Sequence, residues 1–191
     1  MIEVGAFSLQ AAIHPGLDRS TGLTDRYADL GLDASFQKPL ANGDVVAFDG
    51  RFLHERQALK ATCALAGASV PPPTGGMDCA HNDLNDVRFD ASYFWRDKLG
   101  LTFAAFDTFG SANPVLYADH RNFKPDSSGL VLQLDGTPFG DRGQPARRAN
   151  LRMGVQYTLY TRFDGARRNF NGAGRNASDN NTVRVFTWLA F

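Results

Sequence analysis

A strict alternation of apolar and polar side chains between Leu151 and Phe163 is the feature that most constrains this fold. Successive side chains of a β-strand point to opposite faces, whereas a helix repeats every 3.6 residues, so the segment is predicted to be a strand. It is longer than the roughly 9–11 residues that a tilted membrane strand needs. Apart from the polar Thr161, its apolar face comprises Leu151, Met153, Val155, Tyr157, Leu159 and Phe163, and its other face Arg152, Gly154, Gln156, Thr158, Tyr160 and Arg162.

The same alternation recurs along the chain and predicts eight strands. It is clear at 29–37, 45–52 and 87–96, and it is weaker at 7–13, where Phe7, Leu9, Ala11 and Ile13 share one face. Further strands are predicted from Leu99, from Leu130 and at the C-terminus. The predicted fold is one all-β antiparallel domain over 1–191, either an up-and-down transmembrane β-barrel of about eight strands or the C-terminal half of a larger barrel.

The connections between these strands alternate in length. Short turns are expected at 38–43, 96–98 and 136–148, and long loops at 14–24, 61–83, 110–128 and 164–180. Barrels of bacterial outer membranes have long external loops and short periplasmic turns, so this asymmetry favours a membrane barrel. The alternative is a soluble β-barrel or sandwich that serves as a binding module, because its strands alternate equally well.

The C-terminal strand ends on an aromatic residue. Val185, Leu189 and Phe191 share a face and resemble the signal read by barrel-assembly machinery, although Phe186 and Trp188 on the opposite face are also large and apolar. Outer-membrane lipid and that machinery are therefore the expected partners, and the bacterial outer membrane is the expected location. The N-terminus lacks the basic start and apolar core of a secretory signal, so we expect the chain to be a piece of a longer exported protein.

Composition argues against a nucleic-acid-binding protein and excludes a helical membrane protein. The formal net charge is zero over 191 residues, which gives no basis for nucleic-acid binding. No run approaches the roughly 18 apolar residues of a membrane helix. A β-barrel remains compatible with the mean hydropathy of −0.29, because only alternate side chains of each strand meet lipid.

In a membrane barrel the polar faces of the strands would line the lumen. Aromatic residues near strand ends would then form the girdles at the membrane interface, and we assign Tyr93, Trp95, Tyr157, Phe163, Phe186 and Trp188 to them. The charged residues expected to face the lumen are Asp33, Asp49, Arg51, Arg88, Asp90, Arg96, Arg152 and Arg162.

Other candidate chemistry is sparse. Cys63 and Cys79 lie in one long loop, where a disulfide would add about 3 kcal/mol in an exported protein, whereas a cytosolic protein would keep free thiols. Cys79-Ala-His81 does not match the haem-attachment motif C-x-x-C-H. No spacing of residues suggests a catalytic or metal site, so we do not expect an enzyme.

Four segments resemble a known family: Arg26–Ser35, Leu84–Arg96, Phe106–Gly110 and Gly174–Asn181. They are similar to the C-terminal part of a proteobacterial family usually labelled cytochrome c, whose members carry a signal peptide, one N-terminal haem-attachment motif and a long porin-like barrel. The resemblance implies a passive channel or a sheath for an electron-transfer partner, with a cytochrome or a second copy as partner. It implies covalent haem c only in full-length relatives, because the attachment motif is missing here.

Overall fold

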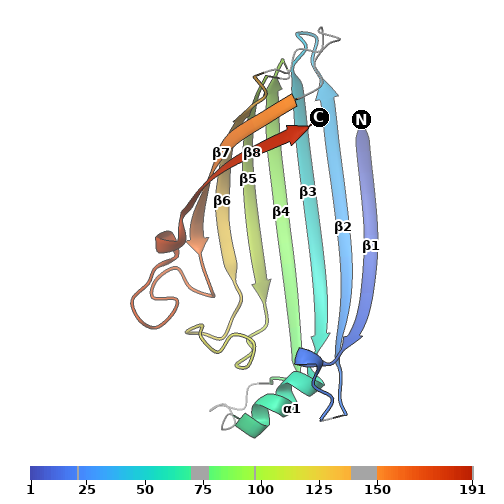
Figure 1. Ribbon diagram of the computed structural model, residues 1–191, viewed down its shortest axis with the longest axis vertical. Coiled ribbons are helices and arrows are strands. Elements are labelled where there is room, and N and C mark those ends of the chain that lie inside the picture. The colour runs from blue at the N-terminus through green and yellow to red at the C-terminus, as the bar shows by residue number, and fades with distance from the viewer. Residues whose placement is uncertain (21, 70–77, 97, 139–149, 191) are drawn as a thin grey trace.

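The chain forms one curved sheet of eight antiparallel strands in a computed structural model, which describes residues 1–191 except 21, 70–77, 97, 139–149 and 191 (Figure 1). The order of the strands in the sheet is their order in the sequence. The predicted all-β, eight-stranded, up-and-down arrangement is confirmed. The strands are β1 (Ile2–Ile13), β2 (Asp25–Pro39), β3 (Val45–Ala58), β4 (His81–Trp95), β5 (Leu99–Gly110), β6 (Ser127–Gly136), β7 (Asn150–Arg162) and β8 (Thr182–Ala190).

The sheet has two open edges. Within the described residues β1 pairs only with β2, and β8 pairs only with β7. Because the strands alternate in direction, the two edge strands run in opposite directions. Each edge leaves a row of backbone N–H and C=O groups without a partner strand, which is the usual point of attachment for further strands.

The strands pair in a register that keeps the same division into two faces across the whole sheet. Residues directly opposite one another on paired strands share a face, so a row of partners can be followed from β1 to β8. One row is apolar throughout: Ile2, Phe36, Phe48, Ala91, Phe103, Leu132, Tyr157 and Val183. We call the face that contains this row the outer face. The inner face contains the neighbouring row, which comprises Glu3, Ser35, Asp49, Asp90, Ala104, Val131, Thr158 and Thr182.

The inner face is the concave side of the sheet. Ala104 and Val131 on this face are 1% and 5% exposed, whereas Phe103 and Leu132, their immediate neighbours on the outer face, are 46% and 52% exposed. Curvature crowds side chains on the concave side and spreads them apart on the convex side. The sheet therefore has a crowded concave face, which carries most of the charged strand residues together with some apolar ones, and an apolar convex surface.

The first strand departs from its neighbours. Its weak apolar set falls on the inner face, because Phe7 lies opposite Gly31 and Leu9 lies opposite Asp29. Ile2 and Val4 are on the outer face, so β1 carries apolar side chains on both sides. Phe7 fills the space above Gly31, where an added Cβ would come within 2.1 Å of the phenyl ring.

The connections after β1, β3, β5 and β7, of 11, 22, 16 and 19 residues, lie at one end of the sheet, which we call the loop end (Figure 1). The connections after β2 and β4 at the other end have only 5 and 3 residues, but the one after β6 has 13, so the expected alternation in length does not hold there. One long connection contains helix α1 (Lys60–Ser69), which lies below the loop ends of β2–β4 and which the two-residue period does not predict. Alanine-rich composition is the signal that indicates it, because alanine has the highest helix propensity. Two short 3₁₀ segments, η1 (Pro15–Leu17) and η2 (Ala177–Asn180), lie in two other long connections.

A small core anchors helix α1 to the sheet. Leu59 and Ala61 at the start of the helix are fully buried, as is Asp25 at the start of β2. The Asp25 carboxylate accepts hydrogen bonds from the backbone N–H groups of Ala61 (2.8 Å) and Thr62 (3.1 Å) and from the Thr62 hydroxyl (2.5 Å). It therefore caps the N-terminus of a helix from a distant part of the sequence, satisfying amide groups that a helix leaves unpaired.

The same end of the molecule is fastened by a disulfide and by buried amides. Cys63 of α1 is bonded to Cys79, just before β4, with 5.5 Å between the Cα atoms. The fully buried Asn113 donates from Nδ2 to the Cys79 carbonyl oxygen. Asn82 is also buried and donates from Nδ2 to Gln57, while its Oδ1 accepts from the Ser111 hydroxyl. The helix and the loop at 111–126 are thus joined to the ends of β3 and β4.

Candidate functional site

The inner face collects most of the charged residues that the sequence assigned to a lumen. Asp33, Asp49, Arg51, Arg88 and Asp90 come from three adjacent strands and line one shallow depression of about 220 Å³. Arg51 lies directly opposite Arg88, and Asp49 lies directly opposite Asp90. The arginine pair and the aspartate pair lie in adjacent rows. The four residues together carry no net charge, because each like-charged pair is next to the pair of opposite charge.

Ion pairs on the inner face involve two carboxylates that were not among the predicted lumen residues. Arg51 Nη2 lies 2.8 Å from Asp86 Oδ1, and Arg152 Nε lies 2.7 Å from Asp135 Oδ2. Arg88 pairs with Asp90 of its own strand at 2.9 Å. Asp86 and Asp135 lie at inner-face positions of β4 and β6, so the two-residue period could have identified them.

Arg96 does not belong to the strand array. It follows the end of β4, has a φ of 48°, and stacks its guanidinium over the ring of Trp95 at 5.7 Å. Its backbone N–H donates to Asp44 in the neighbouring turn. Because the chain turns at this residue, the alternation of β4 does not extend to it.

Arg162 lies on the outer side of the sheet, and its assignment to the face of Arg152 is wrong. The register between β6 and β7 shifts at Ser128/Gly129, so Ser128 lies opposite Arg162 while Gly129 lies opposite Tyr160. The extra residue, Thr161, is a β-bulge that reverses the side to which the next side chain points. Arg162 therefore shares a face with Ser128 and with Asp107, to which it is paired.

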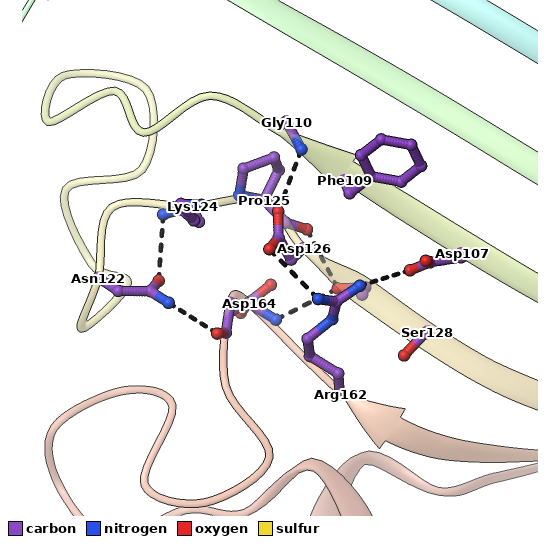
Figure 2. Close-up of polar contacts among 12 residues, drawn as sticks. Asp107, Phe109, Gly110, Asn122, Lys124, Pro125, Asp126, Ser128, Arg162 and Asp164 are labelled. Carbon is purple, nitrogen blue, oxygen red and sulfur yellow. Dashed lines mark hydrogen bonds and ion pairs between the residues drawn. The ribbon is translucent and has the colours of Figure 1, made fainter.

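Figure 2 shows how Arg162 connects three segments at the loop end of the sheet. Its Nη2 lies 2.6 Å from Asp107 of β5, and its Nη1 lies 3.4 Å from Asp126, just before β6. Asp126 also accepts from the Gly110 N–H at 3.1 Å. One arginine thus neutralises two carboxylates and holds the start of the last long connection against the preceding strands.

The two last long loops are bound together by further contacts. Asn122 Nδ2 donates to the Gly165 carbonyl oxygen at 2.6 Å (Figure 2), and His120 Nε2 lies 3.6 Å from Asp164 Oδ2. Burial raises the pKa of the Asp164 carboxyl, and the charges of His120 and Arg175 act against that increase. These loops therefore form one structured layer over this end of the sheet.

The outer face presents an apolar band that crosses all eight strands. Along β2 it runs from Ala28 to Phe36, and charged outer-face residues occur only toward the strand ends, among them Arg26 and Lys38. Within the described strands the other charged outer-face residues also lie near the loop end: His54, Arg56, His81, Asp83, Asp107 and Arg162. The central part of this face is uncharged.

The predicted aromatic and C-terminal positions are divided between the two faces. Tyr93 and Trp95 lie on the outer face near the short-turn end, as a girdle requires, whereas the register places Phe186 and Trp188 on the inner face. Tyr157 lies in the middle of the outer face, and Phe163 follows β7 and packs edge-on against Phe170. Val185 and Leu189 are exposed on the outer face, and Phe191 lies outside the described residues.

The cysteines do not fit covalent haem attachment, because Cys63 and Cys79 are bonded to each other. Among the residues that the structure describes, no group of three or more His, Cys, Asp or Glu side chains is arranged to hold a metal ion. The same residues include no helix with the length and apolar character needed to cross a membrane. The two faces of the sheet are therefore the features from which a function can be argued.

Comparison of the chain with models of protein families, with curated proteins and with solved structures gives no match.

Proposed function

We propose that this chain forms part of the wall of a porin-like β-barrel channel in a bacterial outer membrane, with the outer face toward lipid and the inner face toward a water-filled lumen. The observation that carries the proposal is the uninterrupted apolar row from Ile2 to Val183, together with the exposure of most of its side chains. A soluble sheet that leaves one face in water alternates the other way, with polar side chains outside. Here the convex, exposed side is the apolar one.

The size of the apolar band supports the same assignment. The nine residues from Ala28 to Phe36 span about 26 Å along the strand, or about 20 Å along the barrel axis at a tilt of about 40°. Outer-membrane barrels carry an apolar band about 25 Å tall. Charged residues at both ends of β2, Arg26 and Lys38, would then reach the polar layers on either side of the membrane.

The charges of the inner face favour a wall wider than this sheet alone. In a closed barrel of eight strands the interior is filled by side chains and has no room for bulk water. Carboxylates such as Asp33 and Asp49 have no basic partner within hydrogen-bonding distance in the described structure, and enclosing them without water would cost several kcal/mol each. A lumen with water, completed by additional strands at β1 and β8, removes that cost.

The test uses two neighbouring residues on opposite faces of β6. Leu132→Arg places a charge in the middle of the outer face, and Gln133→Arg places the same charge on the inner face. In a membrane wall the first substitution costs about 2–4 kcal/mol and the second costs little. The measurements are the yield of folded protein in the outer-membrane fraction and heat-modifiable gel mobility after reconstitution in lipid.

A soluble binding module gives the opposite result. Leu132 would already be exposed to water, so Leu132→Arg would leave folding unchanged and improve solubility. Recovery of the unmodified chain as a monomer in buffer without detergent would contradict the membrane assignment. A sheath around a cytochrome is the finer form of the proposal, which the sequence resemblance supports, and a haem absorption band in complexes purified in mild detergent tests it.

A further inference from the structure

The inner face carries an excess of negative charge. Across the described strands it presents eight acidic side chains besides the buried Asp25, and four arginines, a formal charge of minus four. The whole chain has a formal net charge of zero, so this excess is a property of one surface. The acidic residues are Glu3, Asp29, Asp33, Asp49, Glu55, Asp86, Asp90 and Asp135, and the arginines are Arg51, Arg88, Arg152 and Arg184.

Most of the positive charge on this face is already compensated. Arg51, Arg88 and Arg152 each form an ion pair with a carboxylate on the same face. Arg184 lies on β8, with its guanidinium 6.0 Å from the ring of Phe186. The uncompensated carboxylates are concentrated at the other side of the sheet, on β1, β2 and β3.

One pair of carboxylates occupies directly opposed positions on paired strands, where like charges are usually avoided. Asp29 of β2 lies directly opposite Glu55 of β3. Like charges at directly opposed positions destabilise a sheet, and the inner-face neighbours of this pair include no basic residue. Gln57 donates to Glu55, but Asp29 Oδ1 is enclosed and has no hydrogen-bond partner. The enclosed oxygen and the adjacent second carboxylate both raise the energy of this arrangement, and a positive charge near the pair would lower it.

We infer that the lumen lined by the inner face favours cations, and that Asp29 and Glu55 form a step at which a permeating cation is held. The inference rests on the proposed channel function. An excess of like charge in a lumen raises the local concentration of counter-ions, and rings of acidic side chains confer cation preference. A small cation between the two carboxylates would relieve their repulsion.

Planar bilayers in a steep KCl gradient test the inference on the full chain. The reversal potential of the unmodified channel is expected to have the sign of K⁺ preference. The double substitution Asp29→Asn, Glu55→Gln is expected to lower the ratio of K⁺ to Cl⁻ permeability by roughly twofold to tenfold. The matched control is Asp119→Asn, which removes one exposed acidic charge from the long loop between β5 and β6 and should leave the ratio nearly unchanged.

A second measurement does not depend on conduction. If Asp29 and Glu55 repel each other, the double variant refolded in detergent melts at a higher temperature than the unmodified chain at low ionic strength, and the difference disappears in high salt. Anion preference, or a permeability ratio that the double variant leaves unchanged, would overturn the inference while the channel function stands. Absence of any conductance would overturn the channel function itself, and with it the cation preference.

Discussion

Arg162 and Asp107 form an ion pair on the outer side of the sheet, with 2.6 Å between Nη2 and Oδ1, although they lie on strands separated by β6. The pair exists because a single extra residue in β7 reverses the direction of the arginine side chain. At the loop end of the apolar band, the same guanidinium also approaches Asp126. The relationship joins the last long loop to the outer rim of the sheet.

Loss of this arginine should weaken the loop end. Arg162→Met keeps the aliphatic part of the side chain and removes the charge, leaving the nearly buried Asp126 without its cationic partner. We expect the free energy of unfolding to fall by about 1–3 kcal/mol, the usual cost of an unpaired buried polar group. Denaturant titration of the refolded protein in detergent measures it. Arg168→Met, at an exposed loop position, is the control and should change stability little.

The disulfide between Cys63 and Cys79 should stabilise the connection that contains α1. The two residues are 16 positions apart, and closing a loop of this size contributes about 3 kcal/mol in the chain-entropy model. Reduction should therefore lower the unfolding midpoint and expose the connection to proteolysis. The double variant Cys63→Ser, Cys79→Ser should show the same loss and no response to reductant. A reductant response that persists in the double variant would assign the effect to something else.

Asp25 should control the order of helix α1. Asp25→Ala removes a buried carboxylate that accepts from Ala61 and Thr62, and the loss of such a cap costs about 0.5–2 kcal/mol. Hydrogen exchange of amides at 60–67 should accelerate, while exchange in the central strands stays slow. Uniform acceleration throughout the sheet would show that Asp25 supports the whole fold instead.

The short turn between β2 and β3 should lose stability in acid. Hydrogen bonds from the Tyr93 hydroxyl, from the Arg96 N–H and from Asn42 lower the pKa of Asp44. A carboxyl with a lowered pKa stabilises the fold above its ordinary value near 3.8, and this contribution is lost as the pH falls through the lowered pKa. Asp44→Asn should remove that part of the acid dependence, which melting curves between neutral pH and pH about 2 would measure. Unchanged curves for Asp44→Asn would contradict this role.

The strands and turns could be predicted because they depend on local chemistry. The two-residue period at 151–163 and the turn residues at Asn42 and Gly43 identify where strands run and reverse, whichever neighbours they acquire. The same period explains why Asp33, Asp49 and Arg51 share a face with Arg88. Helix α1 was missed because its ten residues are few, and because the residue that caps it, Asp25, precedes the capped Ala61 by 36 positions.

The errors arose where alternation was carried past a local irregularity. For Arg162 the bulge shifts the count by one residue, and for Arg96 the strand has already ended. The shared face predicted for Phe7 and Leu9 is confirmed, and pairing with β2 makes it the inner face, which also carries Asp29 and Asp33. Alternation divides the side chains of one strand into two sets. It does not determine which set lies on the outer face of the assembled sheet.

The sequence by itself determined that the chain is an antiparallel meander of eight strands, because turn chemistry and the strand period act over a few residues. Only the tertiary structure decided which side chains meet. Register placed Asp29 opposite Glu55, the bulge turned Arg162 toward Asp107, and curvature made the polar face concave. These outcomes depend on hydrogen bonding between strands that are distant in sequence, and no single strand encodes them.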